Sequence, residues 1–137
     1  MKRILILGDS LSAAFGIPKE QGWVALLEQR IKTDRLPYRI QNASITGDTT
    51  AGGLSRLPTL LGEPVDVFVA ELGANDALRG VDPAATRQNL DAMLRKVRES
   101  SAEAKLVVVG MSIPANLGPG YSMALASIST EVARQYG

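Results

Sequence analysis

Small and polar residues follow the apolar segments of this chain, and three of them are of types that take part in acyl transfer. The first apolar segment ends at Gly8, Asp9 and Ser10, a later loop contains Gly47, and a third segment is followed by Asn75. A serine hydroxyl can attack a carbonyl carbon once a base accepts its proton. A glycine N–H and an asparagine carboxamide can donate hydrogen bonds to the oxygen that becomes negative in that attack. These residues therefore predict a nucleophile and an oxyanion hole.

Each of the three residues also has a purely structural explanation. A serine that follows a strand is a common N-cap of the next helix, and glycine and asparagine are favoured in turns. Taken singly, the structural explanation is the better one for each residue. Taken together, three such residues at consecutive segment ends favour the catalytic interpretation. In that interpretation Gly8 lets the chain turn tightly, and Asp9 fixes the loop through backbone hydrogen bonds.

Apolar segments typical of strands alternate with segments of helical periodicity. The expected strands cover residues 3–7, 38–43, 65–72 and 106–109, and the expected helices include residues 23–31, 54–61, 83–97 and 125–132. We expect the second helix to be interrupted or to end near Pro58 and Gly62. Asp82 is the expected N-cap of the third helix, with Pro83 as its first residue. This alternation predicts a parallel sheet covered by helices on both faces, with the carboxyl ends of the strands facing one crevice.

Length and charge narrow the classes of protein that this chain can belong to. The 137 residues suit a single domain, 1–137, and a formal net charge of +1 gives no surface for nucleic acid. The first apolar run, of about four residues, is too short for a signal peptide, and no run is long enough for stable membrane insertion. We therefore expect a cytoplasmic protein, or a periplasmic or secreted one if the N-terminus was trimmed. Cysteine is absent, which excludes disulfides and a thiolate nucleophile.

Three aspartates define one alternative function, a metal-dependent phosphoryl-transfer domain. Asp9, Asp48 and Asp76 all stand near expected strand ends, where carboxylates could bind Mg²⁺. However, the chain has no G-x-x-x-x-G-K-[ST] motif. A response-regulator or dehalogenase arrangement would need paired acids after the first strand, where Asp9 stands alone. We therefore predict no metal and no cofactor.

Three blocks of the sequence closely resemble the SGNH or GDSL hydrolase family, in particular its bacterial thioesterase/lysophospholipase and arylesterase branch. They are GDSLS (8–12), NASITGDTT (42–50) and ELGANDALRG (71–80), and SIPANLGPGY (112–121) resembles a later block of the same branch. The resemblance covers almost the whole chain. It implies a three-layer α/β/α fold with a flavodoxin-like parallel sheet. The implied substrates are small acyl esters or thioesters, aryl esters and lysophospholipids.

The resemblance also assigns roles to individual residues. Ser10 resembles the nucleophile and one backbone donor to the oxyanion, Gly47 the second backbone donor, and Asn75 a side-chain donor. The residues that would support these loops are Gly8, Asp9, Asp48, Gly73 and Asp76. The later block supplies three candidates for the substrate pocket, Ile113, Pro114 and Asn116. Ala74 stands where the family more often has glycine, a small change that we expect to be tolerated.

One block of the family pattern is missing, the Asp-x-x-His that supplies the base and its orienting acid, and the chain contains no histidine. We expect a fold truncated after the fourth strand and the helix that follows it. Residues 106–109 would then form an exposed strand edge through which copies could associate. Because loss of the serine or histidine of a serine protease lowers turnover about a million-fold, we expect an incomplete hydrolase with little activity of its own. A non-catalytic acyl- or carbohydrate-binding protein of the same fold is the alternative.

Overall fold

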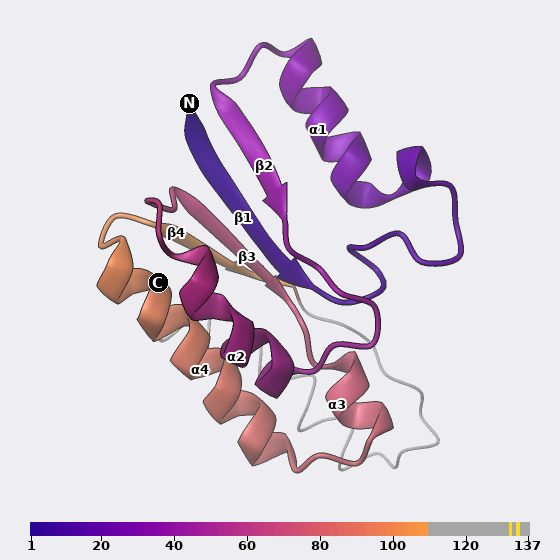
Figure 1. Ribbon diagram of the computed structural model, residues 1–137, viewed down its shortest axis with the longest axis vertical. Helices are drawn as coiled ribbons and strands as arrows, with labels where there is room; N and C mark the ends of the chain where they lie inside the picture. Colours follow the sequence, from indigo (N-terminus) through magenta and orange to yellow (C-terminus); the bar gives the residue numbers. More distant parts are fainter. Residues whose placement is uncertain (110–131, 133, 135–137) are drawn as a thin grey trace.

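Strand β1 (Lys2–Gly8) occupies an inner position in the four-stranded parallel sheet of the computed structural model (Figure 1). The structure describes residues 1–109, 132 and 134. The strand order is β2-β1-β3-β4, in which β2 is Tyr38–Asn42, β3 is Val67–Glu71 and β4 is Lys105–Val108. All three pairings are parallel. The flavodoxin-like order predicted from the sequence is therefore confirmed for these four strands.

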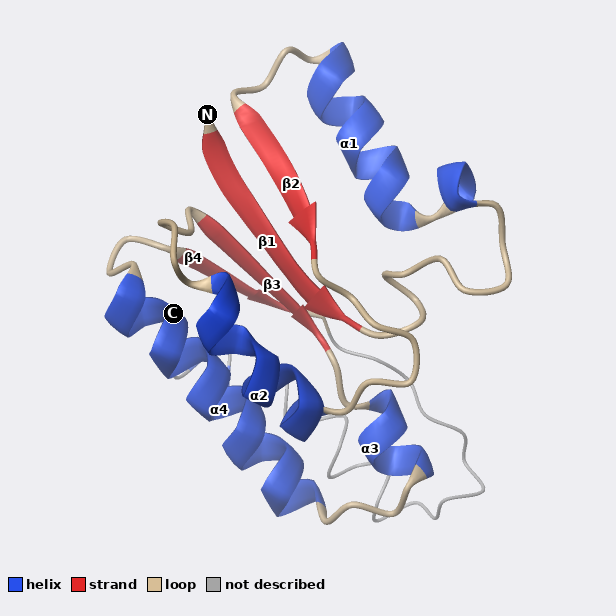
Figure 2. Cartoon of the chain, in the orientation of Figure 1, coloured by secondary structure: helices blue, strands red, loops and turns tan. Residues whose placement is uncertain are grey.

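Helices cover both faces of this sheet, as Figure 2 shows. Helix α1 (Trp23–Thr33), preceded by the short 3₁₀ helix η1 (Lys19–Gln21), lies over one face. Helices α2 (Thr50–Leu60) and α4 (Pro83–Ser100) lie side by side over the other face. Helix α3 (Ala74–Leu78) follows β3 at the carboxyl edge of the sheet. The result is the three-layer α/β/α arrangement that the alternation of patterns predicts.

The aliphatic run of β1 connects the two outer layers. Ile4 and Ile6 belong to the apolar cluster under α1, whereas Leu5 and Leu7 belong to the cluster under α2 and α4. Successive residues of a strand point to opposite faces, so a strand covered on both sides needs an uninterrupted apolar sequence. Val132, which is helical and fully buried, packs in the second of these clusters.

The boundaries of α2 differ from the expected ones. The helix begins at Thr50, where the Oγ1 of the N-cap Thr49 accepts a hydrogen bond from the N–H of Gly52 at 3.2 Å. It then continues through Pro58 and ends at Leu60, so the expected end of this helix near Pro58 and Gly62 is confirmed, with Pro58 inside the last turn. Proline lacks an N–H and removes one helical hydrogen bond. In the last turn of α2 this loss leaves the preceding turns intact.

Helix α4 begins as predicted, because the Asp82 carboxylate accepts a hydrogen bond from the N–H of Ala84 at 3.0 Å and Pro83 is the first helical residue. Helices η1 and α3 are absent from the sequence-based expectation, since three and five residues are too few for a periodic pattern. Residues 125–131 of the expected last helix lie outside the described residues. So do the pocket candidates Ile113, Pro114 and Asn116.

Strand β4 is the edge of the sheet among the strands that the structure describes. The side chains of Val107 and Val109 are 45% and 38% exposed there, which is high for valine next to a sheet. Association of copies through this edge stays a prediction. Across the described residues, no helix is both long enough and apolar enough to span a membrane.

Candidate active site

The loops that follow β1, β2 and β3 are joined by hydrogen bonds at the carboxyl edge of the sheet. The N–H of Ile45, after β2, donates to the carbonyl of Gly8 at 3.0 Å. The Nδ2 of Asn75, after β3, donates to the carbonyl of Asp48 at 2.9 Å. Figure 1 shows the three loops at the same end of the sheet. The blocks that carry Ser10, Gly47 and Asn75 are therefore neighbours in space, although 65 residues separate the first from the last.

Ser10 lies in a tight turn that its neighbour Asp9 closes. The Asp9 side chain is 1% exposed, and its Oδ1 accepts a hydrogen bond from the N–H of Leu11 at 3.1 Å. The carbonyls of Asp9 and Ser10 accept from the N–H groups of Ala13 and Phe15, both at 3.0 Å. Ser10 itself is half-buried. The chain continues in turns rather than in a helix that begins here, so Ser10 does not serve as the N-cap that the structural explanation proposed.

Gly47 adopts a backbone conformation that favours glycine. Its φ is +82°, in the left-handed region that L side chains rarely occupy. Among residues 1–109, 132 and 134, a Cβ at this position would contact only the guanidinium of Arg79, at 3.9 Å, so the requirement there is one of backbone conformation rather than of space. The same guanidinium donates to the carbonyl of Gly47 at 3.0 Å. This bond links the loop after β2 to the end of α3.

Asp48 anchors the same loop to α2. Its carboxylate accepts from the guanidinium of Arg56, which also donates to the carbonyl of Ala43 at 2.8 Å. The other carboxylate oxygen accepts the N–H of Thr49 at 3.0 Å. A Cβ on Gly52 would lie 2.0 Å from that oxygen, so only glycine fits there. One arginine and one aspartate thus hold both ends of the loop that contains Gly47.

Asn75 and Asp76 lie in the first turn of α3, after Gly73, whose φ of +133° turns the chain sharply out of β3. A carboxamide nitrogen carries two N–H groups. The bond from Asn75 to the carbonyl of Asp48 uses one of them, and no acceptor for the second is found among the described residues. The position of Asn75 therefore depends on the backbone directly after Gly47.

Asp76 points in the opposite direction, into the protein, where it is 1% exposed. Its Oδ1 accepts the N–H of Thr50 at 2.8 Å, and its Oδ2 accepts the hydroxyls of Thr50 at 2.5 Å and Thr86 at 2.9 Å. The Nδ2 of Asn89 donates to the hydroxyl of Thr50 at 3.1 Å. This single buried carboxylate joins the starts of α2, α3 and α4.

These contacts bear on the metal-dependent alternative. The carboxylates of Asp9, Asp48 and Asp76 accept hydrogen bonds from N–H, O–H or guanidinium groups. Nowhere in residues 1–109 or at 132 and 134 do three acidic, histidine or cysteine side chains gather as a metal site would need. In the described part of the chain, the three aspartates thus hold loops in place through these hydrogen bonds.

A buried glutamate directly behind the nucleophile loop was not singled out from the sequence. Glu71, the last residue of β3, is 2% exposed, and burial raises the pKa of its carboxyl to about 7. Its Oε1 accepts the hydroxyl of Ser12 at 2.7 Å, and that hydroxyl accepts the indole N–H of Trp23 at 3.2 Å. The signal in the sequence was a single carboxylate within the otherwise apolar run of residues 67–72.

Several large apolar side chains on the three loops face solvent. Leu11 and Phe15 are 61% and 72% exposed after β1, Ile45 is 48% exposed after β2, and Leu78 is 66% exposed at the end of α3. Exposed apolar side chains that gather at one end of a fold commonly mark a binding surface. This end of the sheet is the one that carries Ser10.

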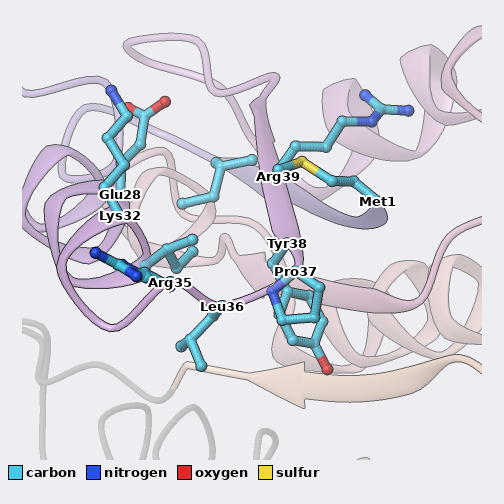
Figure 3. Close-up of a pocket in the computed structure, with 10 residues that line it drawn as sticks. Met1, Glu28, Lys32, Arg35, Leu36, Pro37, Tyr38 and Arg39 are labelled. Carbon is cyan, nitrogen blue, oxygen red and sulfur yellow. The ribbon is translucent and has the colours of Figure 1, made fainter.

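A cavity of about 590 Å³ lies elsewhere, between α1 and the start of β2 (Figure 3). Arg35, Leu36, Pro37 and Tyr38 line it, together with Met1. Tyr38 and Met1 lie at the amino ends of β2 and β1, whereas ligands of open α/β sheets bind beyond the carboxyl ends. Of the predicted site residues that the structure describes, none lines this cavity.

Comparison with known proteins agrees with the fold and with the three sequence blocks. Residues 6–137 match the model of the GDSL-like lipase/acylhydrolase family, and the chain belongs to this family. It is 48% identical over 133 residues to "Esterase TesA" of Pseudomonas aeruginosa, a match that covers 96% of this chain and 65% of that protein. It is 40% identical over 122 residues to "Arylesterase" of Vibrio mimicus, covering 88% of this chain and 60% of that protein.

A third relative is "Thioesterase 1/protease 1/lysophospholipase L1" of Escherichia coli, which is 40% identical, with 97% of this chain and 62% of that protein covered. The chain thus spans less than two thirds of the length of these curated relatives. Among solved structures, the crystal structure of TesA superposes with a TM-score of 0.91 at 47% identity, covering 98% of this chain and 74% of that one. AlinE4, described as an SGNH-hydrolase family esterase, gives a TM-score of 0.89 at 37% identity, covering 98% and 72%.

Replacement of Asp76 tests whether its carboxylate holds the site together. Asp76→Asn should lower the free energy of unfolding by about 1–3 kcal/mol, because an amide nitrogen would meet hydroxyls that now donate to a carboxylate oxygen. Urea denaturation followed by circular dichroism measures this. Asp34→Asn is the matched control, since it removes only an exposed ion pair with Arg30 and should cost less than about 1 kcal/mol. Equal losses in the two variants would contradict the assigned role.

Proposed function

We propose that this chain carries the nucleophile and the oxyanion hole of a serine hydrolase that cleaves acyl esters or thioesters. The observation that carries the proposal is the joining of the loops after β1, β2 and β3 by direct hydrogen bonds. These loops contribute Ser10, Gly47 and Asn75. Membership of the GDSL-like lipase/acylhydrolase family, and relatives named as an esterase, an arylesterase and a thioesterase, support the same reaction class.

The proposed reaction proceeds in two acyl-transfer steps. The Oγ of Ser10 attacks the acyl carbon while a base accepts its proton, and the carbonyl oxygen becomes negative. The N–H groups of Ser10 and Gly47 and the second N–H of Asn75 donate to that oxygen. The bond to the alcohol or thiol then breaks, the base returns the proton to the leaving group, and water releases the acid from the acyl-serine by the same route.

These 137 residues contain no histidine, the side chain that most often accepts the proton of a catalytic serine. Asp9, the acid next to Ser10, is buried and accepts the N–H of Leu11 instead. An oxyanion hole and binding without the triad leave about 10³–10⁴-fold acceleration over water. The 137 residues by themselves should therefore hydrolyse esters slowly.

The exposed apolar side chains support an acyl group as the part of the substrate that is bound. The loop after β1 contributes Leu11 and Phe15, which follow Ser10 in sequence. The loop after β2, which is hydrogen-bonded to Gly8, contributes Ile45, and α3 contributes Leu78. Burial of an alkyl or aryl group against such side chains contributes about 25 cal/mol per Å² of apolar surface. Small acyl esters, thioesters and aryl esters are therefore the proposed substrates.

The absence of histidine favours a second candidate, a non-catalytic protein of the same fold that binds acyl or carbohydrate ligands. One comparison separates the two candidates. The 137-residue chain is assayed on p-nitrophenyl butyrate beside a chimera that adds the C-terminal part of Pseudomonas aeruginosa TesA beyond the matched region. We expect turnover near background for the first protein and at least about a thousand-fold more for the second, lost again in Ser10→Ala. A folded chimera that binds an acyl ligand without turnover would favour the binding protein.

The same chimera tests the donor role of Asn75. Asn75→Ala should lower kcat by about 10²–10³ with little change in KM, because a transition-state donor is removed. Asn89→Ala is the matched control, since it also removes a side-chain amide. The Asn89 amide lies on α4 and donates to the hydroxyl of Thr50, whereas that of Asn75 donates to the carbonyl of Asp48. If both variants lost activity equally, the effect of Asn75 would be structural and its role as a donor would be wrong.

A further inference from the structure

Glu71 lies directly against the backbone that leads to Ser10. It ends β3 opposite Gly8 of β1, and a Cβ on Gly8 would come within 2.9 Å of its Oε1 and 2.6 Å of the Ser12 hydroxyl. Gly8 is therefore glycine because the Glu71 and Ser12 side chains occupy the space beside it. The 2% exposure of Glu71 means that water does not solvate this carboxyl group.

The two oxygens of Glu71 have different surroundings. Oε1 accepts the hydroxyl of Ser12 at 2.7 Å and faces the N–H of Asp9 at 3.4 Å. Oε2 is buried and has no hydrogen-bond donor among the described residues. A buried carboxylate oxygen without a donor is costly, whereas a protonated oxygen becomes a donor itself and needs an acceptor.

The carboxylate of Asp9, whose backbone N–H faces Oε1, is the candidate for that acceptor. Burial raises the pKa of Glu71 to about 7, and the Asp9 side chain adds to this effect through hydrogen bonding and through its negative charge. The bond from Ser12 acts in the opposite direction. Asp9 is the charged group that acts on Glu71 from the β1 side, while α1 contributes the neutral indole of Trp23 through Ser12. Two adjacent buried carboxyl groups that share one proton are stable, whereas two ionised ones repel each other.

We propose that protonated Glu71 is a positioning residue for the nucleophile loop, donating its proton to Asp9 and accepting the hydroxyl of Ser12. These two contacts hold the chain on both sides of Ser10. Asp9 in turn accepts the N–H of Leu11, so the whole turn is fixed from the end of β3. The catalytic meaning of this arrangement rests on the proposed function, but the proton itself can be measured without any hydrolysis.

The composition of the chain makes that measurement specific. Trp23 is the only tryptophan, and its indole N–H donates to the Ser12 hydroxyl that Glu71 holds. With no histidine and no cysteine, the ordinary group that titrates between about pH 5 and 8 is the α-amino group. That group belongs to Met1, at the far end of β1 from the loop. A change in tryptophan emission in this range therefore reports Glu71.

The experiment records Trp23 emission from pH 5 to 9 in the 137-residue chain and in three variants. The unsubstituted chain should show a transition with a midpoint near pH 7. Glu71→Gln should abolish it, because glutamine keeps the shape and the hydrogen bonds of the protonated acid without a titration. Ser12→Ala should weaken it by breaking the link to the indole. The surface variant Glu103→Gln should leave the transition unchanged.

Thermal unfolding of the same proteins gives a second readout with a fixed sign. The folded-state pKa of Glu71, about 7, is above its ordinary value of 4.5, so its contribution to stability is complete below about pH 4.5 and is lost as the pH rises through about 7. The Tm of the unsubstituted chain should therefore fall relative to that of Glu71→Gln between these pH values.

The outcomes distinguish this proposal from the proposed function. A flat emission profile in the unsubstituted chain, the same transition in Glu71→Gln, or an unfolded Glu71→Gln variant would each overturn the role of Glu71. None of these results depends on ester hydrolysis. Conversely, a chimera without turnover, beside a 137-residue chain that shows the Glu71 transition, would overturn the proposed function alone.

Discussion

The arrangement of the candidate site depends on one buried carboxylate, that of Asp76. It accepts hydrogen bonds from the backbone and hydroxyl of Thr50 and from the hydroxyl of Thr86, so three helices begin at one point. Asn75 immediately precedes Asp76, and Thr50 lies only three residues after Gly47. Burying a carboxylate is costly unless donors surround it, and this one has three. The two candidate oxyanion donors after β2 and β3 are therefore held in register by an interaction that lies beneath them.

The first loop is held by a different use of the same chemistry. Asp76 accepts three hydrogen bonds, whereas among the described residues only one oxygen of Glu71 has a donor, and the nearby Asp9 side chain helps to raise the pKa of Glu71. Donors offset the burial of the Asp76 carboxyl group, whereas the proposed proton shared with Asp9 would offset that of Glu71. Asp76 directly follows Asn75 in sequence, and Asp9 directly precedes Ser10. Each of these two acids is therefore adjacent to a candidate catalytic residue. The buried acids of this chain thus hold the loops that carry the candidate catalytic residues.

The sequence predicts the layers and strand order because these follow from local pattern. The aliphatic run of β1 indicates a strand covered on both faces, and Asp82 with Pro83 marks the start of α4. Three features could not be predicted in this way. The bond between Ser12 and Glu71 joins residues 59 apart, α3 is too short to show a period, and Pro58 is tolerated only because α2 ends two residues later. Each depends on tertiary contacts or on distance to a helix end.

The central claim is that the hydroxyl of Ser10, the N–H of Gly47 and the carboxamide of Asn75 address one reacting carbonyl group. A crystal structure of the TesA chimera after reaction with an alkyl phosphonate tests it most directly, because the phosphoryl oxygen takes the position of the oxyanion. The account predicts a covalent bond from phosphorus to the Oγ of Ser10, with that oxygen about 2.7–3.1 Å from the nitrogens of Ser10, Gly47 and the Asn75 side chain. An adduct whose phosphoryl oxygen contacts neither Gly47 nor Asn75, or an adduct on another residue, would contradict it.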